Sequence, residues 1–259
     1  MLVLINKKCE MGCKHCMHDC KPTDTEELSL DKIKKIIEYA NSTYVLNLII
    51  SGGEPLLHSN FFDILNYVKN NFKGMSMTIT TNGLPLNNKE VKNKMYNILK
   101  ENKKILLQIT NDKNFYKKEI EVLKDEKFTS LQNVEVIKKL TILVNRGRAK
   151  INNLRPEAFG LRRRNSPTCF NSRSTFKYTK DINKAVTTME NRLKFCGFGF
   201  DYNGNFIISE CLKSYGTIDE LLCDKSIIEK RIIKDFKPCN ECGDCKNLEL
   251  KAKKYIESF

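Results

Sequence analysis

The chain has 259 residues, 41% of them hydrophobic, which is enough for one full-sized core or for a core with a small appended domain. No run of about eighteen apolar residues and no signal-peptide pattern occurs, which excludes a membrane span and predicts a cytoplasmic protein. Eleven cysteines in that compartment predict metal or cluster ligands rather than disulfides. The net charge of +14 is compatible with nucleic-acid binding, but the lysines are dispersed and no RNA-binding module is visible, so nucleic acid is not an expected partner.

Short apolar strands alternate with amphipathic helices along the first part of the chain. Strands are predicted at residues 2–5, 45–51, 75–83, 105–110 and 140–145. Apolar residues recur at helical spacing over residues 30–40, 61–68 and 91–99, and Ser29 is a suitable cap for the first of these helices. Repeated strand–helix units predict an α/β fold in which right-handed crossovers wrap parallel strands into a partial (β/α) TIM-like barrel.

Polar or glycine-rich motifs follow four of the predicted strands. They are the cysteines of CEMGCKHC (9–16), SGGEP (51–55), TTNG (80–83) and ITND (109–112). Because the chemistry of such barrels gathers at the C-terminal ends of the strands, these motifs predict an active site at one rim.

The alternation fails from about Arg146. Residues 151–190 are predicted to be a connection that covers the active site, with a helix near 181–192. Further on, Asn203 and Gly204 stand between alternating apolar residues and predict a hairpin, which Cys196 and Cys211 flank. With CNECGDC at 239–245, this composition predicts a small cysteine-rich domain over residues 191–259.

The first cysteine group has the spacing C-x3-C-x2-C at Cys9, Cys13 and Cys16, and Cys20 follows. Structural zinc prefers four closed ligands, commonly in two C-x2-C pairs, whereas three close thiols suit a [4Fe–4S] cluster. Three ligands leave one iron open for a substrate or cofactor. If Cys20 is a fourth ligand, the site is an electron carrier or a zinc site.

Residues 1–150 resemble the radical S-adenosylmethionine (SAM) enzymes and are predicted to be one domain. CEMGCKHC matches the C-x3-C-x-aromatic-C motif of that family, with His15 in the ring position. SGGEP matches its glycine-glycine-glutamate motif at the end of the second strand, and TITTNG and LQIT resemble its third- and fourth-strand motifs.

The resemblance implies that Cys9, Cys13 and Cys16 hold a [4Fe–4S] cluster whose open iron binds SAM. One electron would then cleave SAM to methionine and a 5′-deoxyadenosyl radical that abstracts hydrogen from the substrate. The cofactor-binding residues that it implies are Gly52, Gly53, Glu54, Pro55, Thr81, Asn82, Gln108 and Thr110. Paired glycines are also ordinary in a tight strand-to-helix turn, and the other residues are ordinary at turns and strand ends.

The later part of the chain resembles radical SAM enzymes with SPASM or twitch domains. NRGRAKINNL (145–154) resembles their glycine-arginine-alanine segment, and the predicted hairpin resembles the start of their auxiliary domain, although its C-x7-G-x6-C spacing departs from the usual C-x9–15-G-x4-C. The resemblance implies one auxiliary [4Fe–4S] cluster, with structural zinc as the alternative. Its ligands would be Cys196, Cys211 and two of Cys239, Cys242 and Cys245.

Two cysteines remain outside both groups. Cys169 lies in the aperiodic connection and is a candidate catalytic hydrogen donor, although a single cysteine is usually a small buried hydrophobe, as is expected of Cys223.

Family resemblance indicates the chemistry better than the substrate. We predict an oxidoreductase that modifies a peptide or protein side chain, as maturases of ribosomal peptides and protein-activating enzymes do. Its expected partners are the peptide, which the basic residues 146–164 would contact, a separate peptide-recognition protein, and a low-potential electron donor such as flavodoxin or ferredoxin. The alternatives are a radical SAM enzyme for RNA or a small molecule, and a non-catalytic iron–sulfur carrier. SGGEP argues against the carrier, which needs no SAM-binding turn.

Overall fold

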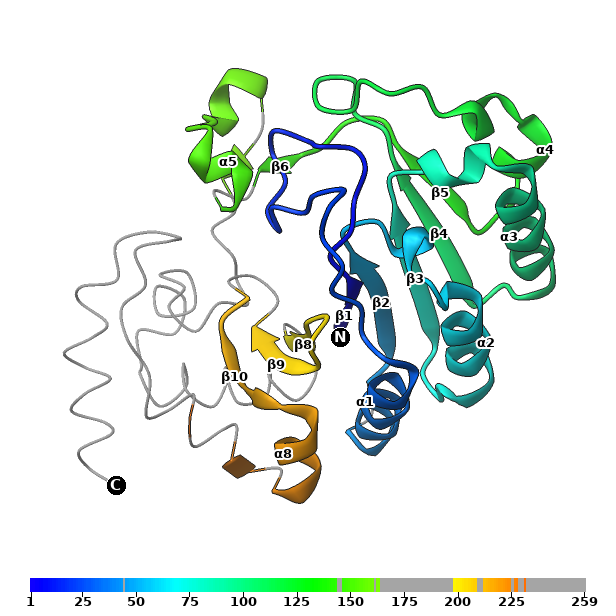
Figure 1. Ribbon diagram of the computed structural model, residues 1–259. Coiled ribbons are helices and arrows are strands. Elements are labelled where there is room, and N and C mark those ends of the chain that lie inside the picture. The colour runs from blue at the N-terminus through cyan, green and yellow to red at the C-terminus, as the bar shows by residue number, and fades with distance from the viewer. Residues whose placement is uncertain are drawn as a thin grey trace, which may run out of the picture.

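A computed structural model describes residues 1–43, 45–143, 146–160, 162–163, 198–208, 212–224, 226–227 and 231 (Figure 1). Eight strands form one sheet in the order β10-β9-β8-β1-β2-β3-β4-β5. The neighbours from β8 through β1 to β5 pair in parallel, whereas β8 with β9 and β9 with β10 pair antiparallel. The fold is therefore mixed α/β with a mostly parallel, open sheet, and the prediction of a partial barrel is confirmed.

The strands of this sheet are β1 (Leu2–Asn6), β2 (Asn47–Gly52), β3 (Ser76–Thr81), β4 (Ile105–Thr110), β5 (Val134–Ile137), β8 (Phe198–Phe200), β9 (Asn205–Ile208) and β10 (Ser214–Thr217). A second, two-stranded sheet pairs β6 (Ile142–Leu143) with β7 (Arg162–Arg163). The α-helices are α1 (Leu30–Ser42), α2 (Phe61–Asn71), α3 (Lys89–Glu101), α4 (Glu126–Thr129), α5 (Arg148–Ile151) and α8 (Ile218–Cys223). In the described part of the chain no helix is long and apolar enough to cross a membrane.

Side chains cap two of the three longest described helices. Ser29 caps α1 as predicted, and its side chain accepts a hydrogen bond from the backbone N–H of Lys32. Asn88 caps α3 in the same way. Asn60 is the cap position of α2 and makes no side-chain cap bond.

The helices α1, α2, α3 and α8 cover one face of the sheet, and the main core lies between these helices and the sheet, whereas α5 lies apart from them (Figure 1). Alternate strand residues such as Leu48, Ile50, Met77, Ile79, Leu107 and Ile109 are buried in this core. The intervening residues Asn47 and Ile49 of β2 are exposed, and Ser51 is half-buried. Because strand side chains alternate between faces, the second face of β2 is left accessible.

Four strands differ from the sequence prediction, and of these β7 and β10 were not predicted at all. β5 was not predicted, because its four residues follow a short turn and include a charged one, Glu135. The strand expected at 140–145 is described only as the two residues of β6, and it pairs with Arg162 and Arg163 of the predicted connection instead of joining the main sheet.

The predicted hairpin is present as β8 and β9. Gly204 has φ 78° in its turn, and the Asp201 carboxylate accepts hydrogen bonds from the backbone N–H groups of Asn203 and Asn205, both at 2.9 Å. β8 lies alongside β1, and Phe198, Phe200, Phe206, Ile218 and Leu221 are buried in the main core. The described part of residues 191–259 therefore continues the barrel sheet.

Candidate functional site

The loop with the first three cysteines and the SGGEP turn meet at the C-terminal ends of β1 and β2. We call residues 9–20 the cysteine loop. The backbone N–H of Gly53 donates to the Asn6 carbonyl at 2.9 Å, and that of Glu54 donates to the Lys8 carbonyl at 2.8 Å. The Asn6 side chain donates in return to the Glu54 carbonyl at 2.8 Å. These bonds fix the start of the cysteine loop against the turn.

Both glycines of the turn are required by close backbone contacts. A Cβ at Gly52, where φ is 147°, would lie 2.3 Å from the Asn6 carbonyl oxygen. A Cβ at Gly53 would lie 2.3 Å from the carbonyl oxygen of Lys8 and 2.4 Å from that of Lys7. The glycine pair thus lets β2 end in direct contact with the chain that leads into the cysteine loop. The sequence predicted these glycines either beside the cofactor or in a tight turn, and the structure places both against the chain that follows β1.

Glu54 joins the ends of β2 and β3. Its carboxylate is fully buried and accepts hydrogen bonds from the Thr81 hydroxyl at 2.7 Å, the Asn82 backbone N–H at 2.7 Å and the Leu56 backbone N–H at 3.1 Å. Burial raises the pKa of Glu54 to about 8, against the effect of these donors, which favour the ionised form. Pro55 starts a short 3₁₀-helix, Pro55–Leu57, and is buried.

The three predicted cluster ligands lie on a loop with two left-handed turns, at Gly12 (φ 62°) and Asp19 (φ 51°). Cys9 is buried, whereas Cys13 and Cys16 are half-buried, and all have free thiols. The Asn82 amide contacts the Cys9 sulfur at 3.8 Å, which links the cysteine loop to the end of β3. Burial raises the pKa of Cys9 to about 12 and that of Cys13 to about 11.

Cys20 is buried, and its thiol interacts with that of Cys16. This interaction, together with backbone donors, lowers the pKa of Cys16, whereas the same interaction and burial raise the pKa of Cys20. The two thiols therefore influence each other's ionisation.

The donor chemistry of the cysteine loop fits an iron–sulfur cluster. Cys9, Cys13 and Cys16 offer soft sulfur donors from three positions of one loop, which suits several irons of an iron–sulfur cluster. They are the residues of this chain that would hold it.

His15 occupies the ring position between the second and third cysteines. Its ring packs on Phe115, with centroids 4.3 Å apart, and on Tyr116 at 5.5 Å. Burial lowers the pKa of His15 to about 4, so the ring is neutral. Phe115 belongs to a small second core with Leu143 and Ala149, which attaches the cysteine loop to the chain after β4 and to α5.

The two predicted residues of β4 differ in their surroundings. Thr110 is buried at the end of the strand. Gln108 is half-buried, and its amide donates to the Glu135 carboxylate at 2.9 Å on the neighbouring strand β5. Glu135 was not predicted as a site residue, because β5 was not predicted.

Side chains from two distant segments also reach the cysteine loop. Lys118 donates to the Glu10 carbonyl at 2.8 Å, Asn152 donates to the Lys14 carbonyl at 3.0 Å, and Arg148 contacts the loop near Cys16 and Cys20. These contacts were not predicted, because side chains that bind loop carbonyls leave no periodic pattern in the sequence.

Several predicted site residues lie outside the described residues. They are Cys169, Cys196, Cys211, Cys239, Cys242, Cys245 and Arg164. Cys223 is described and is exposed at the end of α8.

The sequence profile of the Radical SAM superfamily matches residues 3–148, which is more than half of the 259 residues. The chain therefore belongs to the radical SAM superfamily. Membership implies a [4Fe–4S] cluster and SAM as cofactors, in agreement with the cysteine loop and the SGGEP turn described above.

Curated relatives match a short part of the chain. The probable GTP 3′,8-cyclase of Methanococcus maripaludis is 35% identical over 83 residues, or 32% of this chain and 28% of that protein. The mycofactocin maturase MftC of Mycolicibacterium smegmatis is 32% identical over 76 residues, or 29% of this chain and 19% of that protein. The matches span less than a third of the length of these relatives.

Solved structures share the fold over most of the chain. BtrN in complex with AdoMet and 2-DOIA has a TM-score of 0.60 at 17% identity, covering 95% of this chain and 92% of that chain. Streptococcus suis SuiB bound to precursor peptide SuiA has a TM-score of 0.54 at 12% identity, covering 93% of this chain and 69% of that chain. At these identities the likeness defines the fold alone.

Proposed function

We propose that this protein cleaves SAM reductively and oxidatively modifies a peptide or protein side chain. The observation that carries the proposal is the position of the cysteine loop beside the SGGEP turn at the C-terminal edge of the sheet. Gly53 and Glu54 donate to the carbonyls of Asn6 and Lys8, which lead into the loop, and the Asn82 amide contacts the Cys9 sulfur. When bound, the cluster and SAM supply an electron and a radical that abstracts hydrogen.

The proposed ligands of the cluster are Cys9, Cys13 and Cys16. Cys20, which is buried, is proposed to stay out of the cluster, because SAM rather than a thiol must occupy the fourth iron. The proposed SAM-binding residues are those of the turn and of the neighbouring strand ends: Gly52, Gly53, Glu54, Pro55, Thr81, Asn82, Gln108 and Thr110.

A peptide substrate is supported by two of the similar proteins. MftC is named as a mycofactocin maturase, and SuiB has been solved with its precursor peptide. The basic residues 146–164 would contact acidic groups of the peptide, and residues 151–190 would cover the active site. A separate recognition protein would deliver the peptide, and a flavodoxin or ferredoxin in the cytoplasm would supply electrons.

An auxiliary [4Fe–4S] cluster in residues 191–259 would accept the electron that remains after hydrogen abstraction. Its proposed ligands are Cys196, Cys211 and two of Cys239, Cys242 and Cys245. Anaerobic reconstitution should then give about eight irons per chain, and about four in the triple variant Cys9→Ala, Cys13→Ala and Cys16→Ala. Bound zinc together with only four irons would contradict the auxiliary cluster.

A small-molecule substrate is the second candidate. It is supported by the GTP 3′,8-cyclase among the relatives and by BtrN, which was solved with 2-DOIA. The two candidates are separated by incubating reduced protein and SAM with a short peptide encoded beside its gene, or with GTP. Loss of two hydrogens from the peptide, measured by mass spectrometry, supports the first candidate. Conversion of GTP with an unchanged peptide replaces it with the second.

A further inference from the structure

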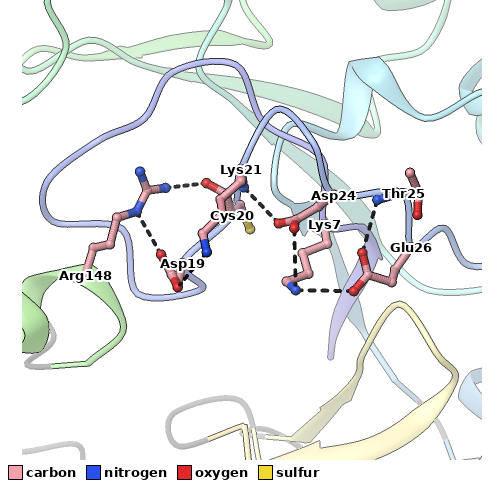
Figure 2. Close-up of polar contacts among 8 residues, drawn as sticks. All are labelled: Lys7, Asp19, Cys20, Lys21, Asp24, Thr25, Glu26 and Arg148. Atoms are coloured by element: carbon pink, nitrogen blue, oxygen red, sulfur yellow. Dashed lines mark hydrogen bonds and ion pairs between the residues drawn. The ribbon is translucent and has the colours of Figure 1, made fainter.

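Arg148 connects the cysteine loop to α5, far along the chain (Figure 2). Its backbone N–H donates to the Cys16 carbonyl at 2.9 Å, and its guanidinium donates to the Cys20 carbonyl. The Nε atom also lies 3.1 Å from a carboxylate oxygen of Asp19. One residue therefore contacts the loop at its third cysteine and at the two residues that end it.

The preceding glycine makes this approach possible. Gly147 has φ 52°, and a Cβ there would lie 2.5 Å from the Cys16 carbonyl oxygen and 2.7 Å from that of Met17. The backbone of α5 thus begins in direct contact with the loop. Asn152, at the other end of α5, donates to the Lys14 carbonyl at 3.0 Å. The Gly-Arg pair and Asn152 together hold residues 14–20.

The guanidinium suits this task because its donors form a rigid planar fork. The Cys20 carbonyl accepts a hydrogen bond from one nitrogen of the group, and the Asp19 carboxylate forms an ion pair with another. Arg148 has only 19% of its side chain exposed, so these interactions form in a partly desolvated position where they are stronger than in water. Lysine has one ammonium at the end of a flexible chain and would keep only part of the set.

The segment that follows the loop is held separately. The Lys21 N–H donates to the Asp24 carboxylate at 2.8 Å, and Lys7 pairs with Asp24 at 3.7 Å and with Glu26 at 3.2 Å (Figure 2). Lys7 follows β1 directly, so this network ties the exit of the loop to the sheet. Arg148 acts on the part of the loop between the second cysteine and this exit.

We propose that Arg148 is a positioning residue that clamps the Cys16 side of the cysteine loop and thereby sets the environment of the cluster. The inference rests on the cluster site of the proposed function. Hydrogen bonding and charge around an iron–sulfur cluster tune its reduction potential, and partners outside the first ligand sphere commonly change metal affinity or activity about 10–100-fold when removed. A nearby guanidinium favours the reduced, more negative cluster.

The test compares Arg148→Met, Arg148→Lys and Asp19→Asn with a control, Lys103→Met, which removes one exposed positive charge at the opposite edge of the sheet. Asp19 has φ 51°, which asparagine tolerates, so Asp19→Asn removes the carboxylate charge without straining the turn. Hydrogen exchange of residues 10–20 is measured in the cluster-free chain. The cluster potential, its electron paramagnetic resonance spectrum and SAM cleavage are measured after reconstitution.

Arg148→Met should speed exchange in residues 14–20, lower the cluster potential and slow SAM cleavage about 10–100-fold. Arg148→Lys should recover part of each change, and Lys103→Met should match the wild type. Unchanged hydrogen exchange and an unchanged cluster potential in Arg148→Met would overturn the inference. SAM cleavage by the wild-type protein would in that case still support the proposed function. If Arg148→Met does not fold, Asp19→Asn decides: faster loop exchange supports the clamp, and wild-type exchange with a wild-type potential overturns it.

Discussion

Gly53→Ala should separate the SGGEP turn from the cysteine loop. The new Cβ would lie 2.3 Å and 2.4 Å from the carbonyl oxygens of Lys8 and Lys7, against 3.4 Å or more for an ordinary contact. The two segments must therefore move apart by about 1 Å, the difference between 3.4 and 2.3 Å. Neither neighbour is a flexible side chain that could move aside.

The cost follows from the bonds that cross this junction. The hydrogen bonds from Gly53 to Asn6 and from Glu54 to Lys8, at 2.9 and 2.8 Å, would break or lengthen. A buried polar group that loses its partner costs about 1–3 kcal/mol, so the two together predict a loss of about 2–6 kcal/mol in the free energy of unfolding.

Urea unfolding of the cluster-free chain measures this loss. Gly160→Ala is a matched control, because a Cβ there meets nothing within 4 Å although φ is +64°. The free energy of unfolding of that control should fall by about 1–2 kcal/mol, because alanine is strained in a left-handed backbone conformation. If Gly53→Ala destabilises the chain no more than Gly160→Ala and retains full iron after reconstitution, the reasoning about the glycine pair is wrong.

Three further predictions concern the same site. Thr81→Val removes the hydroxyl that donates to Glu54 at 2.7 Å and accepts from the Gly83 N–H at 2.9 Å. Urea unfolding should therefore show a loss in the free energy of unfolding that is about 1–3 kcal/mol larger than that of the control Thr81→Ser, which keeps the hydroxyl. Equal losses in the two variants would contradict the role of the hydroxyl. Burial raises the pKa of Glu54 to about 8, so the contribution of this group to stability is complete below pH 4.5 and is lost as the pH rises through 8. Unfolding free energies of Glu54→Gln should therefore fall less steeply than wild-type values over that range, and parallel curves would refute the shift. Cys20→Ala should keep SAM cleavage and four irons at the first site, and loss of cleavage with retained cysteine-loop structure would make Cys20 a ligand.

The barrel was predictable because its sheet and helices carry strong periodic signals. The buried runs of β1 to β4 and the apolar spacing of α1 marked the strand–helix units, and Ser29 marked the helix start. The location of the site followed from topology, since parallel strands bring their C-terminal ends to one edge. The cysteine spacing and SGGEP then indicated the chemistry.

The contacts that shape the cysteine loop were not predictable in the same way. Arg148 and Lys118 bind backbone carbonyls, which every residue has, so the sequence of the loop does not reveal its partners. The glycines of SGGEP were predicted from resemblance to face a cofactor, whereas their close approach to Asn6 and Lys8 becomes visible only when β1 and β2 are paired. β5 was missed because four residues give too short an alternation.

SAM cleavage tests the central claim most directly. The reconstituted, anaerobically reduced protein is incubated with SAM, and 5′-deoxyadenosine is measured by chromatography in the wild type, in Cys13→Ala and in the exposed control Cys223→Ala. We expect release of 5′-deoxyadenosine by the wild type and Cys223→Ala and none by Cys13→Ala. A wild-type protein that holds its four-iron cluster, accepts an electron and leaves SAM intact would contradict the account.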